Sequence, residues 1–285
     1  MSTVQRHATT GRTGLIIMAD ESNSTAQRIN TVGSMASVLG PTPTVCSAIT
    51  YGVNSTLQEA CLIAARNDGS IRDLADIAVF GYGNVISSLL RGPLSGQDFV
   101  TLPQLAESPK RTETHHQGEN EYDVPIWVDT TANGGTPMCR AFRHAATLAQ
   151  TWTVTNQNGR GLYVLNLTDG EATDGTRDDL LEATRRITKI TVGGTPATVF
   201  NVNIAAGQSD PIVFPHKRDL LDGEDARTMF DISSILPDGM RDEAARMGLP
   251  THDQSRAMVY NADARILLSA IRIGTMPANL AGEVR

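Results

Sequence analysis

Aromatic residues are scarce in this sequence, and positive charge is nowhere concentrated. Phe, Trp and Tyr make up 5% of the chain. A core with so few rings has to be built from Ile, Leu, Val, Ala and Met. No run of Lys and Arg is longer than a pair, and the formal net charge is -7. This charge balance argues against a nucleic acid or an anionic membrane surface as the main partner.

Long apolar runs and paired cysteines are also missing. No stretch approaches the run of about 20 apolar residues that a membrane helix needs. The polar start of the chain, before Leu15, predicts no secretory signal, so we expect a cytoplasmic protein with no membrane partner. Cys46, Cys61 and Cys139 are odd in number, far apart and without a Cys-x-x-Cys pair, which favours buried free thiols.

Apolar runs of strand length alternate with segments of helical periodicity. The predicted strands are 15–19, 74–82, 84–90, 161–168, 198–204 and 211–214, and the predicted helices are 45–66, 137–152, 176–188, 238–247 and 263–271. This alternation predicts an α/β fold, with a Rossmann-like doubly wound, mostly parallel central sheet and helices on both faces. A tight turn through Gly83 predicts one antiparallel edge strand. Residues 91–126 are polar and rich in Pro, Gly and charge, which predicts a long surface loop or an insertion, unusual enough to suspect a role.

Oxygen-bearing side chains cluster in three loops that follow or precede these elements. Asp20, Ser22 and Ser24 follow the first strand, Thr136 lies in a Gly-Gly-Thr-Pro segment before a helix, and Asp169 follows the 161–168 strand. In an open α/β sheet such loops converge at the carboxyl ends of neighbouring strands. Two carboxylates and three hydroxyls are hard ligands, which suit Mg²⁺, with Mn²⁺ or Ca²⁺ as alternatives, better than Zn²⁺. Waters complete the coordination sphere, and a partner's carboxylate can replace one of them.

The order of these motifs resembles the von Willebrand factor A (VWA) domain with its metal-ion-dependent adhesion site (MIDAS). The pattern is Asp-x-Ser-x-Ser, then Gly-Gly-Thr-Pro before a helix, then an apolar strand ending in Thr-Asp-Gly. The resemblance covers about 13–204 and fills all five motif positions with Asp20, Ser22, Ser24, Thr136 and Asp169. It implies a single VWA-like domain over 1–285, with 205–285 as a C-terminal helical extension packed on the core.

Two departures from the family pattern lie beside the motif. Asn23 stands where the family commonly has Gly, and we expect Asn to tolerate the left-handed backbone of that turn. Residues 25–44 separate the motif from the first good helix, and we expect this segment to sit beside the metal and shape partner choice. The tail resembles stand-alone bacterial VWA proteins of tellurium-resistance and related stress or conflict gene clusters.

The resemblance implies a non-catalytic interaction module whose Mg²⁺ binds an Asp or Glu of a partner protein, with the oligomeric state left open. A Mg²⁺-dependent phosphoryl-transfer enzyme is the alternative. It would need Asp-x-Asp after the first strand, where this chain has Asp20-x-Ser22, and a phosphate-binding GxxxxGK[ST] loop is absent. A scaffold without a metal is the third possibility, and the complete ligand set argues against it.

Other polar residues near the motifs receive ordinary structural interpretations. His115 and His116 are expected to be a solvated pair in the 91–126 loop. We expect Glu21 to be a solvated or packing carboxylate, and Glu171 and Asp174 to cap the helix that follows them, with their charge able to tune the site.

Overall fold

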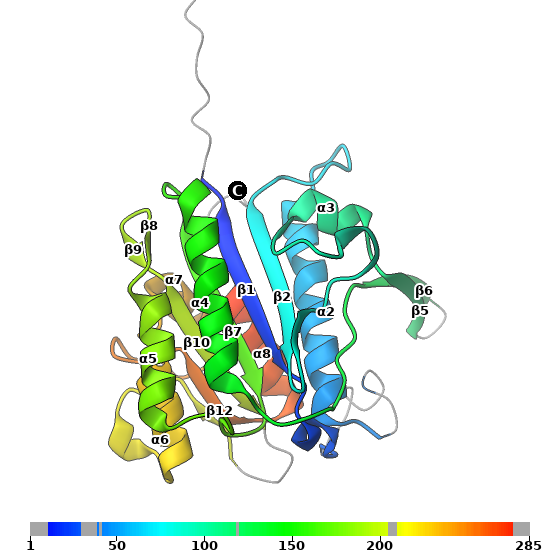
Figure 1. Ribbon diagram of the computed structural model, residues 1–285. Helices are drawn as coiled ribbons and strands as arrows, with labels where there is room; N and C mark the ends of the chain where they lie inside the picture. Colours follow the sequence, from blue (N-terminus) through cyan, green and yellow to red (C-terminus); the bar gives the residue numbers. More distant parts are fainter. Residues whose placement is uncertain (1–10, 30–38, 40–41, 118–119, 205–209, 276–285) are drawn as a thin grey trace, which may run out of the picture.

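A single large sheet forms the middle layer of the molecule, with helices on both faces (Figure 1). The computed structural model describes residues 11–29, 39, 42–117, 120–204 and 210–275. The sheet has 8 strands in the order β11-β12-β10-β7-β1-β2-β3, and β4 pairs with β2 beside this path. Its strands are β1 Thr13–Asp20, β2 Ala75–Tyr82, β3 Ile86–Ser88, β4 Val100–Thr101, β7 Gly161–Thr168, β10 Thr198–Ile204, β11 Ile212–Val213 and β12 Met258–Ala262.

The helices connect the strands of this sheet. They are α2 Val45–Ala64, α3 Leu102–Glu107, α4 Met138–Thr155, α5 Arg177–Thr188, α6 Glu224–Ile232, α7 Asp238–Arg246 and α8 Ala264–Thr275, with short 3-10 turns η1 Asn23–Ala26, η2 Gly92–Leu94 and η3 Arg218–Leu220. Two hairpins lie outside the sheet, namely β5 Arg111–Gln117 with β6 Asn120–Ile126, and β8 Thr191–Val192 with β9 Thr195–Pro196.

The centre of the sheet is parallel and its edges are antiparallel. β1 lies between β2 and β7, β10 follows β7, and β12 follows β10, all in parallel register. All residues of β1 and β2 are buried, because a parallel sheet is covered on both faces. β3 runs antiparallel to β2 at one edge, as the predicted hairpin requires. β4 also runs antiparallel to β2, and β11 runs antiparallel to β12 at the other edge, and neither of these was predicted as an antiparallel strand.

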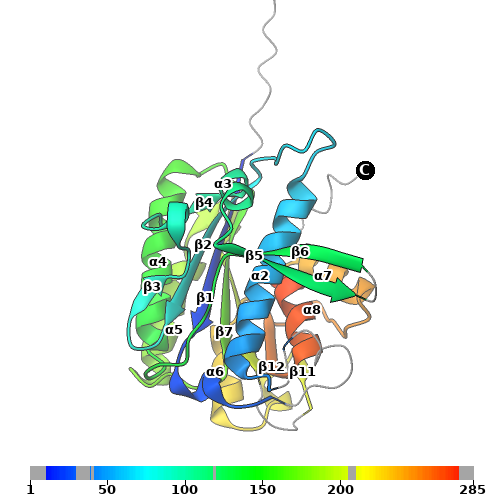
Figure 2. The same ribbon diagram turned by 90° about the vertical axis from the view of Figure 1, so that its right-hand side faces the viewer.

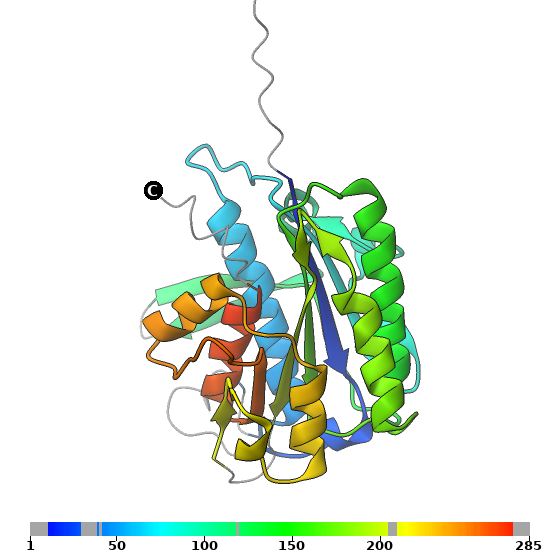
Figure 3. The same cartoon turned by 90° about the vertical axis from the view of Figure 1, so that its left-hand side faces the viewer.

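Alternation along β1 divides the core into two layers. Leu15, Ile17 and Ala19 pack with α2 and α8, whereas Ile16 and Met18 pack with α4 and α5. Figures 2 and 3 show these two helix pairs on opposite sides of the sheet. The α/β fold with a mostly parallel sheet and helices on both faces is therefore confirmed. None of the described helices combines the length and apolar character that crossing a bilayer requires.

Residues 91–126 do not form the predicted long surface loop, and of the two alternatives the insertion remains. This segment contains η2, β4, α3 and the β5–β6 hairpin, which extends away from the sheet (Figure 2). The hairpin pairs only with itself and has little apolar surface to bury, so its sequence lacks the alternation that marks a strand on a core. His115 and His116 lie in β5, and the solvation expected for their side chains lies outside what the structure describes.

The chain after residue 210 adds strands as well as helices to the molecule. β12 extends the main sheet next to β10, and α8 packs against α2. The division into a core over 13–204 and an extension over 205–285 stays a prediction. All three cysteines are free, with Cys61 and Cys139 buried and Cys46 half-buried, as expected for two of them.

Candidate metal centre

The candidate centre lies where the order of the strands changes direction. From β1 the chain crosses through α2 to β2 on one side, while β7 lies on the other side of β1. Loops that follow two such strands diverge and leave a crevice at their carboxyl ends. The segments after β1 and β7 meet there with the segment before α4, at the lower end of the sheet in Figure 1.

Asp20 ends β1 and is fully buried at 0% exposure. Its Oδ1 accepts a hydrogen bond from the backbone N–H of Ser22 at 2.8 Å, and its Oδ2 accepts one from the hydroxyl of Thr168 at 2.6 Å. Burial still raises the pKa of Asp20. No basic side chain of the described residues pairs with this carboxylate.

A line of hydroxyls joins the first loop to Asp169. The Ser24 hydroxyl donates to Asp169 Oδ1 at 2.7 Å, and the hydroxyls of Ser22 and Ser24 share a hydrogen bond across 2.8 Å. Burial, with a contribution from the charge of Asp20, raises the pKa of Asp169 to about 6. Two acidic groups thus lie close together without a cation among the described side chains, an arrangement that a divalent ion would neutralise.

Thr136 is held at the same place by its backbone. Its N–H donates to Thr173 Oγ1 at 3.0 Å, and its C=O accepts from the N–H of Thr173 at 2.9 Å. The Thr136 hydroxyl has no hydrogen-bond partner among the described residues. A Cβ placed on Gly170 would lie 3.6 Å from Thr136 Oγ1 and 3.7 Å from Ser24 Oγ, so both hydroxyls border one small space beside Gly170.

The structure therefore brings the five candidate ligands together. Four of them, Asp20, Ser22, Ser24 and Asp169, form one hydrogen-bonded network, and Thr136 borders it. No group of three or more His, Cys, Asp and Glu side chains suited to a metal occurs in the described ranges. With only two carboxylates, hydroxyls and waters would have to supply most of the roughly six oxygens that Mg²⁺ requires. That donor set fits a hard divalent cation.

Asn23 connects the first loop to the segment that presents Thr136. Its backbone N–H donates to the C=O of Gly134 at 2.9 Å, and its side-chain Oδ1 accepts from the N–H of Gly134 at 3.1 Å. Asn23 is not among the residues with positive φ, so the expected left-handed turn is not formed. Asn contributes its side-chain amide instead, which a Gly could not do. Of the 25–44 segment, residues 30–38 and 40–41 lie outside the described residues.

Glu21 points away from the centre and braces the neighbouring loop. Its Oε1 accepts from the N–H of Thr131 at 2.7 Å and from the Thr131 hydroxyl at 3.0 Å. Its carboxyl group also lies over Gly81 of β2, where a Cβ would collide with it. Glu21 is thus a packing and loop-bracing carboxylate.

The expectation that Glu171 and Asp174 cap α5 is wrong. Asp174 accepts the N–H groups of Cys139 and Arg140 at 2.9 Å each, so it caps the preceding helix, α4. Thr176 caps α5 through a capping box with Asp179. Thr176 is the residue nearest to α5 that carries a short hydroxyl, and it leaves Asp174 free for α4. The carboxyl group of Glu171 instead lies near that of Asp225 of α6, and this neighbouring acid raises the pKa of Glu171.

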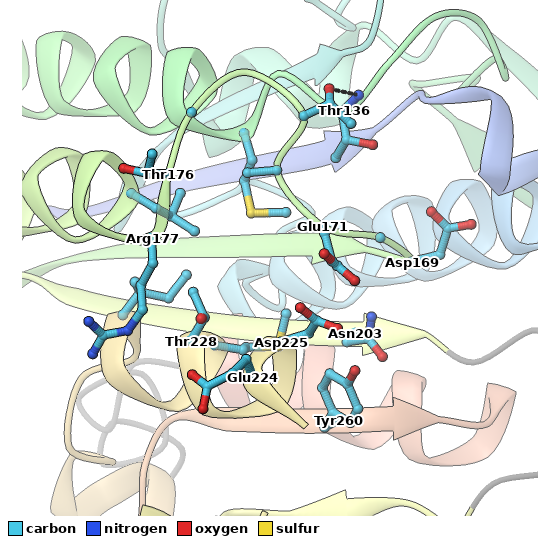
Figure 4. A pocket seen from close by; sticks show the side chains of 18 of the residues that line it. Thr136, Asp169, Glu171, Thr176, Arg177, Asn203, Glu224, Asp225, Thr228 and Tyr260 are labelled. Atoms are coloured by element: carbon cyan, nitrogen blue, oxygen red, sulfur yellow. Dashed lines mark hydrogen bonds between the residues drawn. The ribbon is translucent and has the colours of Figure 1, made fainter. Parts of the chain in front are cut away.

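A cavity of about 690 Å³ opens from the centre toward α6 (Figure 4). Ser24, Thr136 and Asp169 line one part of it, and Asn203 lines another. Sequence reasoning missed Asn203, Thr168 and Thr173. Thr168 could have been suspected from its place at the end of a predicted strand, but its contact with Asp20 depends on the register of β1 and β7.

Comparisons with known proteins give matches among solved structures only. No family model matches the chain, and no curated protein does. The chain is similar to a von Willebrand factor type A protein from Catenulispora acidiphila, at 15% identity and a TM-score of 0.48, over 94% of this chain and 43% of that one.

Two further similar structures are described as metal-bound. One is a manganese-loaded TRAP protein of Plasmodium vivax, at 16% identity and a TM-score of 0.36, over 70% of this chain and 58% of that one. The other is proximal thread matrix protein 1 of the mussel byssus with a zinc-occupied MIDAS motif, at 11% identity and a TM-score of 0.42, over 95% of this chain and 48% of that one. The chain thus spans about half the length of these proteins, and the likeness is too low to transfer a metal or a partner.

Proposed function

We propose that this chain is a non-catalytic, metal-dependent protein-interaction module with a VWA-type MIDAS. Its Mg²⁺ ligands would be Asp20, Ser22, Ser24, Thr136 and Asp169, directly or through water. The observation that carries the proposal is the pair of carboxyl groups of Asp20 and Asp169, which have no basic partner among the described residues and meet three hydroxyls at the strand crossover. When bound, the ion would offer an exchangeable position to a carboxylate oxygen of a partner.

The residues around the site support binding over catalysis. The described residues that line the cavity include no Lys, His or Cys, the side chains that most often serve as bases and nucleophiles. The only basic residue there, Arg177, is bound to Asp231 at 2.6 Å. Phosphoryl transfer would need groups that position a phosphate and its nucleophile. These contacts favour an interaction module over the phosphoryl-transfer alternative.

The domain limits, the location and the biological role of the chain belong to the same proposal. We place residues 1–285 in one VWA-like domain with a core over 13–204. We also propose a cytoplasmic location, and a role in a bacterial stress or conflict system on the resemblance of residues 205–285.

Metal binding is tested with the purified chain by calorimetric titration and thermal unfolding in Mg²⁺, Mn²⁺ and Ca²⁺. At 100 times the Kd, a bound ion stabilises the folded state by about 2.7 kcal/mol, which appears as a higher Tm. Asp20→Ala should lose both the heat of binding and the shift in Tm, with an unchanged circular dichroism spectrum.

The matched control is Asp98→Ala, which removes an exposed acid that does not line the cavity. It should respond to the metal as the unaltered chain does. If none of the three ions gives heat or a shift in Tm, or if Asp20→Ala responds normally, the proposed function is wrong.

A further inference from the structure

The cavity beside the candidate centre has an apolar base and continues well beyond the metal ligands. From Thr136 and Asp169 it passes the start of α5 and reaches α6 and β12 (Figure 4). The apolar side chains that line it are Met138, Ala172, Leu180, Met229 and Ile232. A cavity of about 690 Å³ is large enough for a side chain of a bound peptide in addition to the carboxylate on the metal.

One wall of this cavity carries acidic charge without a basic partner. Glu171 comes from the loop after β7 and Asp225 from the first turn of α6, and both line the cavity, close enough for Asp225 to raise the pKa of Glu171. No basic side chain of the described residues pairs with either of them. The neighbouring Arg177 is taken by Asp231 at 2.6 Å. Glu224 differs, because Arg218 and Arg227 each lie 3.2 Å from its carboxylate.

A buried amide on the same cavity points independently to a ligand. Asn203 is 7% exposed and lies between Asp169 and Tyr260 in Figure 4. Its Oδ1 accepts the backbone N–H of Asn261 at 3.2 Å, which fixes the orientation of the amide, because an N–H group needs an oxygen opposite it. The side-chain NH₂ group is left with no acceptor among the described residues. Because Asn203 lines the cavity, this NH₂ group is available to an oxygen of a ligand that enters there.

We propose that this cavity binds the partner segment next to its metal-bound acid and selects a Lys or Arg there. The aliphatic stem of that residue would lie on Met138 and Met229, and its cationic head would donate to Glu171 and Asp225. Asn203 would donate to a backbone C=O of the same segment. This inference rests on the proposed function, since the acid of the partner is taken to occupy the metal. The partner is thus a protein segment in which Asp or Glu and Lys or Arg are separated by a few residues.

Three features of the cavity favour this occupant over a second metal ion. An apolar base suits the four-carbon stem of a lysine, whereas a hydrated ion gains nothing from it. An amide NH₂ group repels a cation and attracts a carbonyl oxygen. The uncompensated acids lie on an open wall, where a flexible cationic head can reach them.

The experiment uses fluorescein-labelled synthetic peptides with one Asp and one Lys, separated by one, two or three Ala residues, and reads fluorescence anisotropy in Mg²⁺. Each peptide is compared with a version in which norleucine replaces Lys, which keeps the stem and removes the charge. We expect at least one Lys peptide to bind about fivefold to tenfold more tightly than its norleucine version. Equal binding of the two versions at every spacing would overturn the inference.

Charge reversal makes the assignment specific to Asp225. Asp225→Lys should lose the preference for the Lys peptide and prefer a peptide with Glu in its place. Asp222→Lys is the control, because Asp222 is also exposed, lies three positions earlier and does not line the cavity. It should keep the preference. If Asp225→Lys and Asp222→Lys change the peptide preference equally, the acids Glu171 and Asp225 do not select the charge of the partner.

The same peptides separate failure of the inference from failure of the proposed function. Release of every peptide by EDTA or by Asp20→Ala, with no difference between Lys and norleucine, leaves the metal module standing and removes the selectivity. Absence of any peptide binding by a chain that titrates with Mg²⁺ overturns the inference alone. A second Mg²⁺ titration step that Asp225→Lys abolishes would assign the wall to a metal ion and also overturn it.

Discussion

In the metal-free chain, the buried carboxyl group of Asp169 is ionised at a cost in free energy, because burial disfavours its charge. Burial raises its pKa to about 6 from an ordinary value of 3.8, so ionising Asp169 is less favourable in the folded chain than in the unfolded one, although the group is still mostly charged at pH 7. In the metal-free chain, stability should rise as the pH falls through about 6 toward 4, because the folded state takes up its proton before the unfolded state does. Below that range both states are protonated and the gain stops.

Asp169→Asn should therefore stabilise the metal-free chain and remove its response to metal. The amide keeps the shape and loses the buried charge, for an expected gain of about 1 kcal/mol at pH 7 after allowance for partial exposure. Urea unfolding in EDTA measures the gain, and thermal unfolding in Mg²⁺ measures the lost response. A variant that is less stable than the unaltered chain in EDTA would contradict this account.

The five candidate ligands could be named from the sequence because each lies in a short local motif at the end of an apolar run. Their supports could not be named in the same way. Thr168 reaches Asp20 only through the register of β1 and β7, and Thr173 reaches Thr136 only because two loops meet. The role of Asn23 was also missed, since its amide pairs with Gly134, more than a hundred residues away.

At the scale of the element, the start of α4 determines how Thr136 faces the centre. Pro137 is the N-cap position of α4 and offers no side-chain hydrogen bond, so Asp174 supplies the missing acceptor from another loop. A carboxylate at a helix N-terminus also interacts favourably with the helix dipole. The orientation of the loop that carries Thr136 therefore depends on the loop that follows β7 and carries Asp174.

Asp174→Ala should cost about 1–2 kcal/mol of unfolding free energy, as expected for a lost helix cap. It should also weaken Mg²⁺ binding, because Thr136 directly precedes this helix turn. Urea unfolding and calorimetry measure the two effects. Asp178→Ala, whose side chain is 90% exposed in the first turn of α5, is the control and should change neither. Equal losses in both variants would exclude the proposed cap.

Elements with long periodic patterns were predictable, whereas only some of the short ones were. α2 and α4 carry apolar residues at helical spacing over many turns, and β1, β2 and β7 are continuous apolar runs. α6, of 9 residues, and β12, of 5, were missed, although α7, also of 9 residues, was predicted, because a pattern of two or three turns is weak evidence in either direction. The β5–β6 hairpin is polar along its length, so composition favoured a loop there.

At the scale of the whole molecule, three segments far apart in the sequence form one site, and a bound ion should couple them. Hydrogen exchange measured with and without Mg²⁺ should show slowing by about tenfold or more in residues 20–26, 134–137 and 169–176 together, because each would have to release the ion to open. The β8–β9 hairpin, at the far end of β7, is the internal control and should not change. Slowing in one segment only would contradict a shared ion.

The parallel strands also give the molecule a direction. Thr13 begins β1 at the end opposite the site, and β1 spans 8 residues, or about 26 Å at the rise of a strand. α8 begins beside the carboxyl end of β12 and runs back along the sheet, away from the site. A surface, tag or carrier attached ahead of β1 would therefore be held on the remote side. A chain immobilised through that end would present the face that carries the candidate centre to solution.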